Sequence, residues 1–140
     1  MDFFRKRRRC LRPQGAATLE FALTASILFF FLFAALEFSR AHMIYHTCEN
    51  AAYEGARRGI VPGATQQDVI NTTQSILNSA SVTDVLITVT PTNIIADTTQ
   101  VTVVISVQID TNSWVTPLFF AGKTASSSCT LQREKYSNLL

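Results

Sequence analysis

The longest apolar stretch of the chain runs from residue 16 to residue 36 and carries a single charge, Glu20. A helix over these residues is about 30 Å long at about 1.5 Å per residue, which matches the hydrocarbon core of a bilayer. After Leu36 the pattern becomes amphipathic, with apolar or small residues at positions 41, 44, 45, 48, 51, 52 and 55 or 56. We therefore expect one long helix from about Ala16 to Arg58, first transmembrane and then amphipathic, with Gly59 as its C-cap.

A second, shorter helix is expected after Pro62. Thr65 is placed as its N-cap and Asp68 occupies the capping-box position three residues later. The apolar face of this helix continues to about Ser79. It comprises Val69, Ile70, Thr73, Ile76, Leu77 and Ala80.

Beyond the second helix the hydrophobic period changes from that of a helix to two residues, which is typical of β-strands. Three segments have this alternation: 85–90, 101–110 and 124–134. An apolar connector, 113–122, separates the last two and is broken by a proline and a glycine. The expected fold is α+β: a long N-terminal helix, a short second helix and a small three-stranded antiparallel sheet.

The charge of the chain is asymmetric, and this predicts its orientation. Six of the twelve basic residues precede the apolar run, opposed there only by Asp2. Basic residues next to a first span remain cytoplasmic, and they disfavour the alternative of a helix buried in a soluble core. The basic cluster comprises Arg5, Lys6, Arg7, Arg8, Arg9 and Arg12.

This charge pattern divides the chain into three expected parts. Residues 1–15 form a basic cytoplasmic leader, 16–36 a transmembrane helix, and 37–140 an exported α+β domain. The exported part is mildly acidic, so the arginines indicate topology and not nucleic-acid binding. Cys10 is then cytoplasmic, whereas Cys48 and Cys129 are exported, where they either pair as a disulfide or remain buried thiols.

The start of the apolar run, GAATLEF at residues 15–21, combines a flexible glycine with an acid at membrane depth. A protease at the membrane face needs a small residue such as Gly15. Cutting after Gly15 removes the arginines and creates a new α-amine at Ala16. In a helical assembly, Glu20 of one subunit can pair with that amine of a neighbour, which offsets the cost of burying the carboxylate.

This arrangement resembles the class III prepilin signal of type IV filament proteins. Over residues 13–63 the chain resembles the TadE-like family, the minor pseudopilins of the tight-adherence (Flp) pilus. Three ordered elements carry the resemblance: Gly15, Ala16, Glu20, Phe21 and Ala22; then Glu37, Phe38 and Arg40; then Asn50, Ala51, Ala52, Gly55, Ala56 and Arg57.

The resemblance implies cleavage after Gly15 by a prepilin peptidase and a non-enzymatic role, without a cofactor, in adhesion- or secretion-type filament biogenesis. It implies a single-pass protein of the bacterial inner membrane whose partners are the prepilin peptidase, other pilins, pilus-assembly membrane proteins and the bilayer. Major Flp pilins are shorter, so a minor pseudopilin is expected. The alternative is an uncleaved membrane anchor with a small extracytoplasmic sensing or binding domain.

Other patterns allow further interpretations. Ser39 and Ala41 fit the small-residue rule of a secretory signal peptide, but the apolar run is longer than such a signal requires. His42 and His46 have a spacing that can bind zinc, yet no third ligand is placed by the sequence, so we expect no metal site. Trp114 with Leu118, Phe119 and Phe120 is expected to close the core, or else to seat a partner pilin.

Overall fold

The structure, a computed structural model, describes residues 14–95 and 97–133. Most of the basic leader, including Cys10, lies outside the described residues, as does Glu134 at the expected end of the last strand. The chain divides into two compact units, one ending at Phe33 and the other beginning at Ala34. The first contains the N-terminal part of the long helix, and the second contains the rest of that helix and every other element.

Helix α1 spans Gln14–Gly59 without interruption. It begins slightly earlier than expected, so that Gly15 lies in its first turn. Arg57 and Arg58 lie in its last turn, where positive charge is favourable for the helix dipole. The continuous helix confirms the expected joining of an apolar and an amphipathic segment.

Helix α2 spans Gln66–Ser79 and begins as the sequence predicts. The Asp68 backbone N–H donates to the Thr65 hydroxyl, and the Thr65 backbone N–H donates to the Asp68 carboxylate, which completes a capping box. The pKa of Asp68 is lowered by the hydrogen bonds that its carboxylate accepts from the Thr65 backbone N–H and the Thr65 hydroxyl, against a smaller opposing effect of burial, and with a contribution from the charge of Arg58.

The three strands form one antiparallel sheet in the order β1-β2-β3. Strand β1 covers Val85–Thr90, β2 covers Gln100–Gln108 and β3 covers Thr124–Gln132. Val89 pairs with Val103, and Val103 pairs with Cys129, so alternate residues of all three strands face the same side. This confirms the expected α+β fold.

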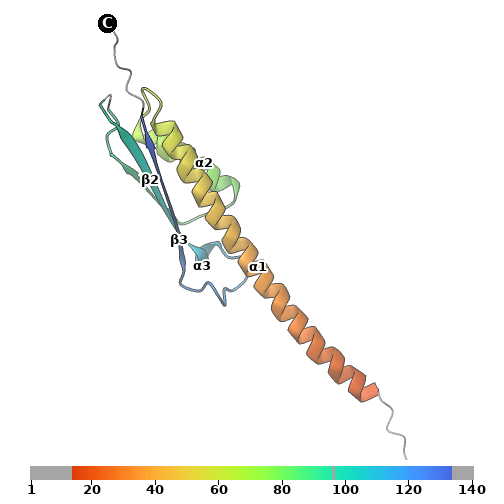
Figure 1. The fold of residues 1–140 in the computed structure, drawn as a ribbon. Helices are drawn as coiled ribbons and strands as arrows, with labels where there is room; N and C mark the ends of the chain where they lie inside the picture. Colours follow the sequence, from red (N-terminus) through yellow and green to blue (C-terminus); the bar gives the residue numbers. More distant parts are fainter. Residues whose placement is uncertain (1–13, 96, 134–140) are drawn as a thin grey trace, which may run out of the picture. The chain divides into compact units, whose positions relative to one another are not determined.

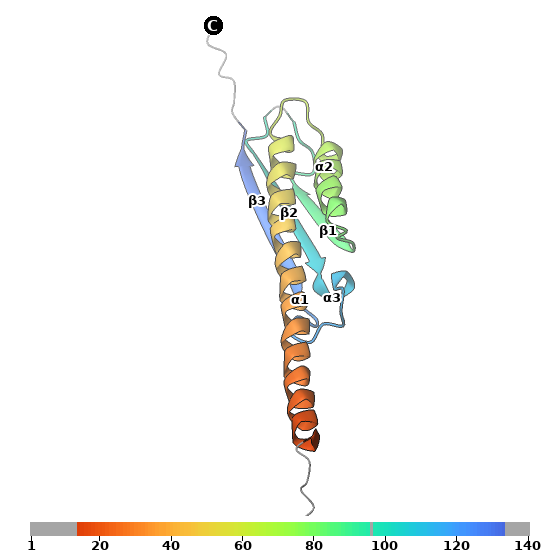
Figure 2. The ribbon, with the colours of Figure 1, turned by 90° about the vertical axis from the view of Figure 1, so that its right-hand side faces the viewer.

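Within the second unit, the sheet forms one layer and the helices form the other (Figures 1 and 2). The core lies between these layers, and its strand side consists of buried alternate residues of β2 together with Val89 of β1 and Ala125 of β3. Its helix side on α1 is a stripe of small and medium-sized residues, which allows close approach. The stripe comprises Ala41, Ile44, Cys48, Ala51, Ala52 and Ala56.

Three details differ from the sequence-based expectations. Strand β2 ends at Gln108, because Ile109–Asn112 turn into the short helix α3. Tyr45 was expected on the buried stripe but is exposed. Gly59 was expected to be the C-cap, but it is the last residue of α1 itself and is not among the glycines with a positive φ in the described chain.

Gly59 has a packing role in place of that capping role. A Cβ added there would lie 2.8 Å from Cγ1 of Val101. The absence of a side chain therefore allows the end of α1 to lie against β2.

Candidate functional site

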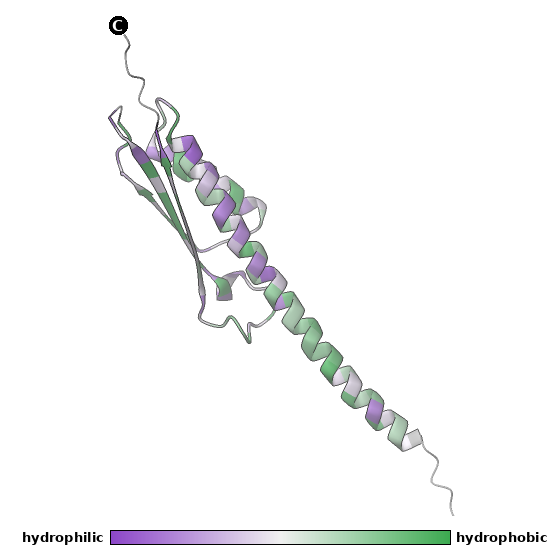
Figure 3. Cartoon of the chain, viewed as in Figure 1, coloured by the Kyte–Doolittle hydropathy of each residue, from purple (hydrophilic) through white to green (hydrophobic). Residues whose placement is uncertain are grey.

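The N-terminal unit presents an apolar helical surface. Among the described residues, one helix is long and apolar enough to cross a membrane, by length and composition, and no residue of its most apolar window is buried. Hydrophobic residues dominate this part of α1 (Figure 3). The hydroxyls of Thr24 and Ser26 donate to the carbonyl oxygens of Glu20 and Ala22, so these polar groups are satisfied within the helix.

The residues of the expected processing site lie at the start of this surface. Gly15 and Ala16 are exposed in the first turn of α1, and a Cβ added at Gly15 would meet no other atom within 4 Å. Glu20 and Phe21 follow one turn later and are also exposed. Within the described part of the chain, Glu20 has no ion-pair partner. Its carboxylate is the single charge of residues 16–36.

Glu37, the next residue after the apolar run, is buried and binds a loop. Its carboxylate oxygens accept three backbone N–H bonds, from Leu118 at 3.0 Å, Phe119 at 2.7 Å and Phe120 at 2.7 Å. Burial raises the pKa of Glu37, but the three N–H donors outweigh that effect, and the net pKa lies below its ordinary value. The residue is thus held as a carboxylate that organises residues 118–120.

Arg40, one turn further along α1, is buried and binds a different set of backbone groups. Its guanidinium donates from Nε to the Asn112 carbonyl oxygen at 2.8 Å, and from Nη1 and Nη2 to the carbonyl oxygens of Ala80 and Ser81, each at 3.1 Å. The Trp114 ring lies over the guanidinium, 4.9 Å from ring centroid to Cζ. Burial lowers the pKa of Arg40, although an arginine remains charged at any physiological pH.

Phe38 lies between these two charged residues in sequence and packs on the same loop. Its ring contacts the rings of Phe119 and Phe120, with centroids 5.7 and 5.0 Å apart. We call Glu37, Phe38 and Arg40 the boundary clamp, because they follow the apolar segment directly and fix two loops to α1. Those loops are residues 80–81 and the connector, residues 113–122, together with Asn112, the last residue of α3.

The third element of the resemblance, residues 50–57, packs α1 on the rest of the second unit. Ala51 and Ala52 are fully buried, whereas Asn50 and Arg57 are exposed, and Arg57 makes a 3.4 Å contact with Glu54. These two polar residues remain available to contact another molecule.

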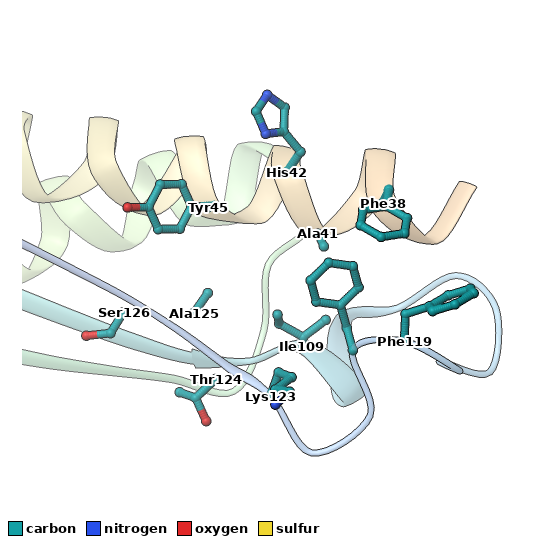
Figure 4. Close-up of a pocket in the computed structure, with 11 residues that line it drawn as sticks. Phe38, Ala41, His42, Tyr45, Ile109, Phe119, Lys123, Thr124, Ala125 and Ser126 are labelled. Atoms are coloured by element: carbon teal, nitrogen blue, oxygen red, sulfur yellow. The ribbon is translucent and has the colours of Figure 1, made fainter. Parts of the chain in front are cut away.

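A groove of about 590 Å³ opens beside the clamp, between α1, the connector and the start of β3. Figure 4 shows Phe38 and Tyr45 on its helix side, with Ile109 and Phe119 opposite. Lys123 contributes a charged group to its lining. Trp114, Leu118 and Phe119 are exposed, so the expected closure of the core by this aromatic cluster is limited to the half-buried Phe120.

The two described cysteines lie in or against the core, and the two histidines lie on the surface. Cys48 and Cys129 are free thiols, and Cys129 packs against the core that contains Cys48. Their pairing stays a prediction. Burial raises the pKa of Cys48 to about 11. His42 and His46 lie on the exposed side of α1 with their Nε2 atoms 3.0 Å apart. The described residues contain no group of three His, Cys, Asp or Glu side chains suited to a metal ion.

One protein family has a model that matches the N-terminal part of the chain. Residues 15–57 match the family model of TadE-like protein. The match confirms the resemblance noted in the sequence, and its limits run from Gly15 to Arg57. Searches of curated proteins and of solved structures returned no match.

The TadE-like segment thus contains the candidate span, the boundary clamp and the small-residue packing stripe. It indicates a Tad pilus-related function, in a family that is generally non-catalytic and that associates with pilus components. The candidate span is consistent with a membrane-anchored component of this kind.

Sequence reasoning missed the partners of the clamp. Asn112 accepts the Thr83 backbone N–H at 2.7 Å and donates to the Thr83 carbonyl at 2.8 Å, while its own carbonyl binds Arg40. Ser81, another partner, has a φ of 52°. The acid and the arginine of the clamp were visible as a motif, but nothing in the sequence marked the backbone groups that they bind.

Proposed function

We propose that this chain is a minor pseudopilin-like component of tight-adherence pilus assembly, cleaved after Gly15 by a prepilin peptidase. The observation that carries the proposal is the family match, which begins at Gly15 and continues through the clamp to Arg57. In this proposal the protein inserts in the membrane, sets the axial register of neighbouring subunits and contacts other pilus components, and it performs no catalytic turnover. Its partners are the peptidase, other pilins, pilus-assembly membrane proteins and the lipid of the bacterial inner membrane, with the exported unit outside the cytoplasm.

The position of Gly15 supports cleavage at that peptide bond. The first four N–H groups of a helix lack intrahelical partners, so opening the first turn of α1 breaks few hydrogen bonds. Within the described residues, a Cβ added at Gly15 would meet nothing within 4 Å beyond its chain neighbours, so tertiary packing does not crowd this residue. Removal of the leader then leaves a helix whose N-terminus is the positive amine of Ala16.

The exposure of Glu20 supports a role in assembly. A carboxylate facing lipid without a partner is unfavourable, whereas an ion pair with the amine of a neighbouring subunit reduces that cost. In this proposal Glu20 fixes the axial register of neighbouring helices. Phe21 and the following apolar residues supply the surrounding helix–helix contacts.

The boundary clamp suits the mechanical requirement of such a subunit. Three charge-assisted bonds to Glu37 and three to Arg40 join the connector and residues 80–81 to α1 at the start of the exported unit. A force on the exported unit is therefore passed to the helix over several short contacts. The exposed Asn50 and Arg57 are proposed contacts for other pilus components.

Two variants test the proposal in cells that produce the pilus machinery. Gly15→Ala should abolish cleavage. Because an added Cβ meets nothing within 4 Å, this change leaves the helix intact, and a block to cutting reports the requirement of the peptidase. Glu20→Gln should be cut normally but should fail to support pilus assembly. Glu49→Gln is the matched control, since it makes the same substitution at an exposed position of α1 outside the apolar segment and leaves Glu20 unaltered.

Each variant has an outcome that contradicts the proposal. Efficient trimming of Gly15→Ala at the same bond would show that the glycine is not recognised. Normal piliation with Glu20→Gln would rule out the ion pair as the assembly determinant. Stable, uncut and functional wild-type protein would favour the alternative, a permanent anchor with a small extracytoplasmic binding domain.

A further inference from the structure

The connector between α3 and β3 exposes apolar side chains that the pseudopilin proposal does not use. Trp114 is 66% exposed, Leu118 is 70% exposed and Phe119 is 45% exposed. Phe38 of α1 is exposed beside them. Isolated apolar residues on a surface are ordinary, but three within six residues, continued by a fourth on the adjoining helix, form a patch that indicates a contact.

The boundary clamp determines the depth of this patch relative to a membrane. The apolar segment ends at Leu36, and the N–H groups of residues 118–120 lie within 3.0 Å of the carboxylate of the next residue, Glu37. Arg40, which contacts the Trp114 ring, lies only about 4.5 Å further along the helix axis at about 1.5 Å per residue. The polar interface on each side of the hydrocarbon core is roughly 5–8 Å thick. The connector therefore falls within that layer.

We propose that residues 114–119 form a second membrane contact, in which Trp114, Leu118 and Phe119 enter the headgroup region of the leaflet that α1 leaves at Leu36. The patch adjoins the end of the apolar segment, because Phe38 packs on Phe119 and because Leu36, two residues before Phe38 on α1, is also exposed. Tryptophan and phenylalanine suit this layer, and tryptophan is enriched there. Lys123 closes the connector with a positive charge that suits anionic headgroups.

The contact gives the exported unit a second point of attachment. A single helix crossing leaves rotation about its axis unrestrained, whereas a side contact held by Glu37 and Arg40 fixes which face of the unit lies against the membrane. The inference depends on α1 spanning the bilayer and is independent of cleavage at Gly15. It can therefore fail while the proposed function holds, and the reverse is also true.

Trp114 is the only tryptophan of the chain, so its fluorescence reports on this loop alone. The full-length protein is reconstituted in vesicles of phosphatidylcholine and phosphatidylglycerol. One set of vesicles has acyl chains brominated close to the headgroup, and another has chains brominated close to the terminal methyl. Bromine quenches tryptophan by contact. We expect strong quenching by the shallow bromines, weak quenching by the deep ones, a blue-shifted emission, and several-fold less quenching by aqueous acrylamide than in the denatured protein.

Two single-tryptophan variants, both in a Trp114→Phe background, calibrate the depth. Ile27→Trp places the probe one residue from the midpoint of the apolar segment 16–36, at a side chain that is 58% exposed, and should be quenched by the deep bromines. Ile95→Trp places it at the opposite end of the sheet, in the β1–β2 connection, with a similar exposure of 54% at the wild-type side chain. This probe should be quenched by acrylamide alone.

The outcomes distinguish contact of the patch with lipid from exposure to water and from contact with a second copy of the chain. If Ile27→Trp is deeply quenched while Trp114 remains accessible to acrylamide and is insensitive to both bromolipids, the loop does not touch the membrane and the inference is wrong. If Trp114 becomes protected only as protein concentration rises, without bromolipid quenching, the patch binds a second copy of the chain, which also overturns it. Shallow quenching that is independent of the protein-to-lipid ratio supports the inference.

Discussion

The contact between Gly55 of α1 and Thr73 of α2 provides a stringent test of how closely the helices pack. A Cβ added at Gly55 would overlap the Oγ1 atom of Thr73, which donates to the Val69 carbonyl at 2.8 Å and is fully buried. Overpacking of this kind costs about 1–3 kcal/mol. Replacing a helical glycine by alanine otherwise raises the free energy of unfolding by about 0.5–1 kcal/mol. We therefore expect Gly55→Ala to lower the free energy of unfolding by about 1–2 kcal/mol.

A double-mutant cycle identifies the cause of that loss. Thr73→Ala removes Oγ1, after which the nearest atoms to the new methyl are Cβ of residue 73 at 3.5 Å and Cγ1 of Val103 at 3.7 Å, both ordinary contacts. Thr73→Ala alone should cost about 1 kcal/mol for its hydrogen bond. The Gly55→Ala/Thr73→Ala double variant should be no less stable than Thr73→Ala, with a coupling energy of about 1–3 kcal/mol.

The assay is urea unfolding of the detergent-solubilised full chain, followed by circular dichroism. Thr72→Ala is the matched control. Its hydroxyl makes the same kind of bond, to the Asp68 carbonyl at 2.8 Å, but residue 72 is not among the atoms that a Cβ at Gly55 would meet. Gly55→Ala and Thr72→Ala should therefore be additive. Additivity of Gly55→Ala with Thr73→Ala, or stabilisation by Gly55→Ala alone, would refute the packing described here.

Three further predictions concern the clamp, the cap and the buried thiol. Because the pKa of Glu37 is lowered in the folded state, the contribution of Glu37 to the free energy of unfolding is present above the ordinary carboxyl pKa of 4.5 and is lost as the pH falls through the folded pKa. Trp114 fluorescence should change across that pH window in the wild type. It should not titrate there in Glu37→Gln. Thr65→Ala removes the N-cap of α2 and should cost about 1 kcal/mol in urea unfolding, and a loss indistinguishable from zero would contradict the capping box. Cys48 is fully buried and its pKa is raised from 9.0 to about 11, so it should be alkylated at least about 100-fold more slowly in the folded chain than in denaturant at the same pH. A thiol unreactive in denaturant until reduced would instead show that Cys48 is paired.

The secondary structure was largely predictable because it is determined by local periodicity. The capping box at Thr65 and Asp68 and the alternation in the three strands need no knowledge of distant residues, and both are confirmed. The exit from β2 into α3 was missed because the apolar pattern continues to Ile109. In the structure, that side chain still packs into the core, from a helix and not from a strand.

The family motif was predictable as a sequence pattern but not as a geometry. Glu37 and Arg40 were identified by resemblance, whereas their partners are backbone groups of residues 80–81, 112 and 118–120, which any sequence possesses. Tyr45 shows that a correct helical spacing does not by itself ensure burial. It has the correct spacing for the buried stripe, yet it lies on the rim of the groove because the core positions beside it are occupied by Ile44 and Cys48.

The most direct test of the central claim is the intact mass of the protein purified from cells, with and without an active prepilin peptidase. Cleavage predicts a mature chain that begins at Ala16 when the peptidase is active, and the full-length chain when it is absent. Detection of only the full-length chain in cells with an active peptidase would contradict the account. So would a mature chain that begins after Ala41, which is the product of a secretory signal peptidase.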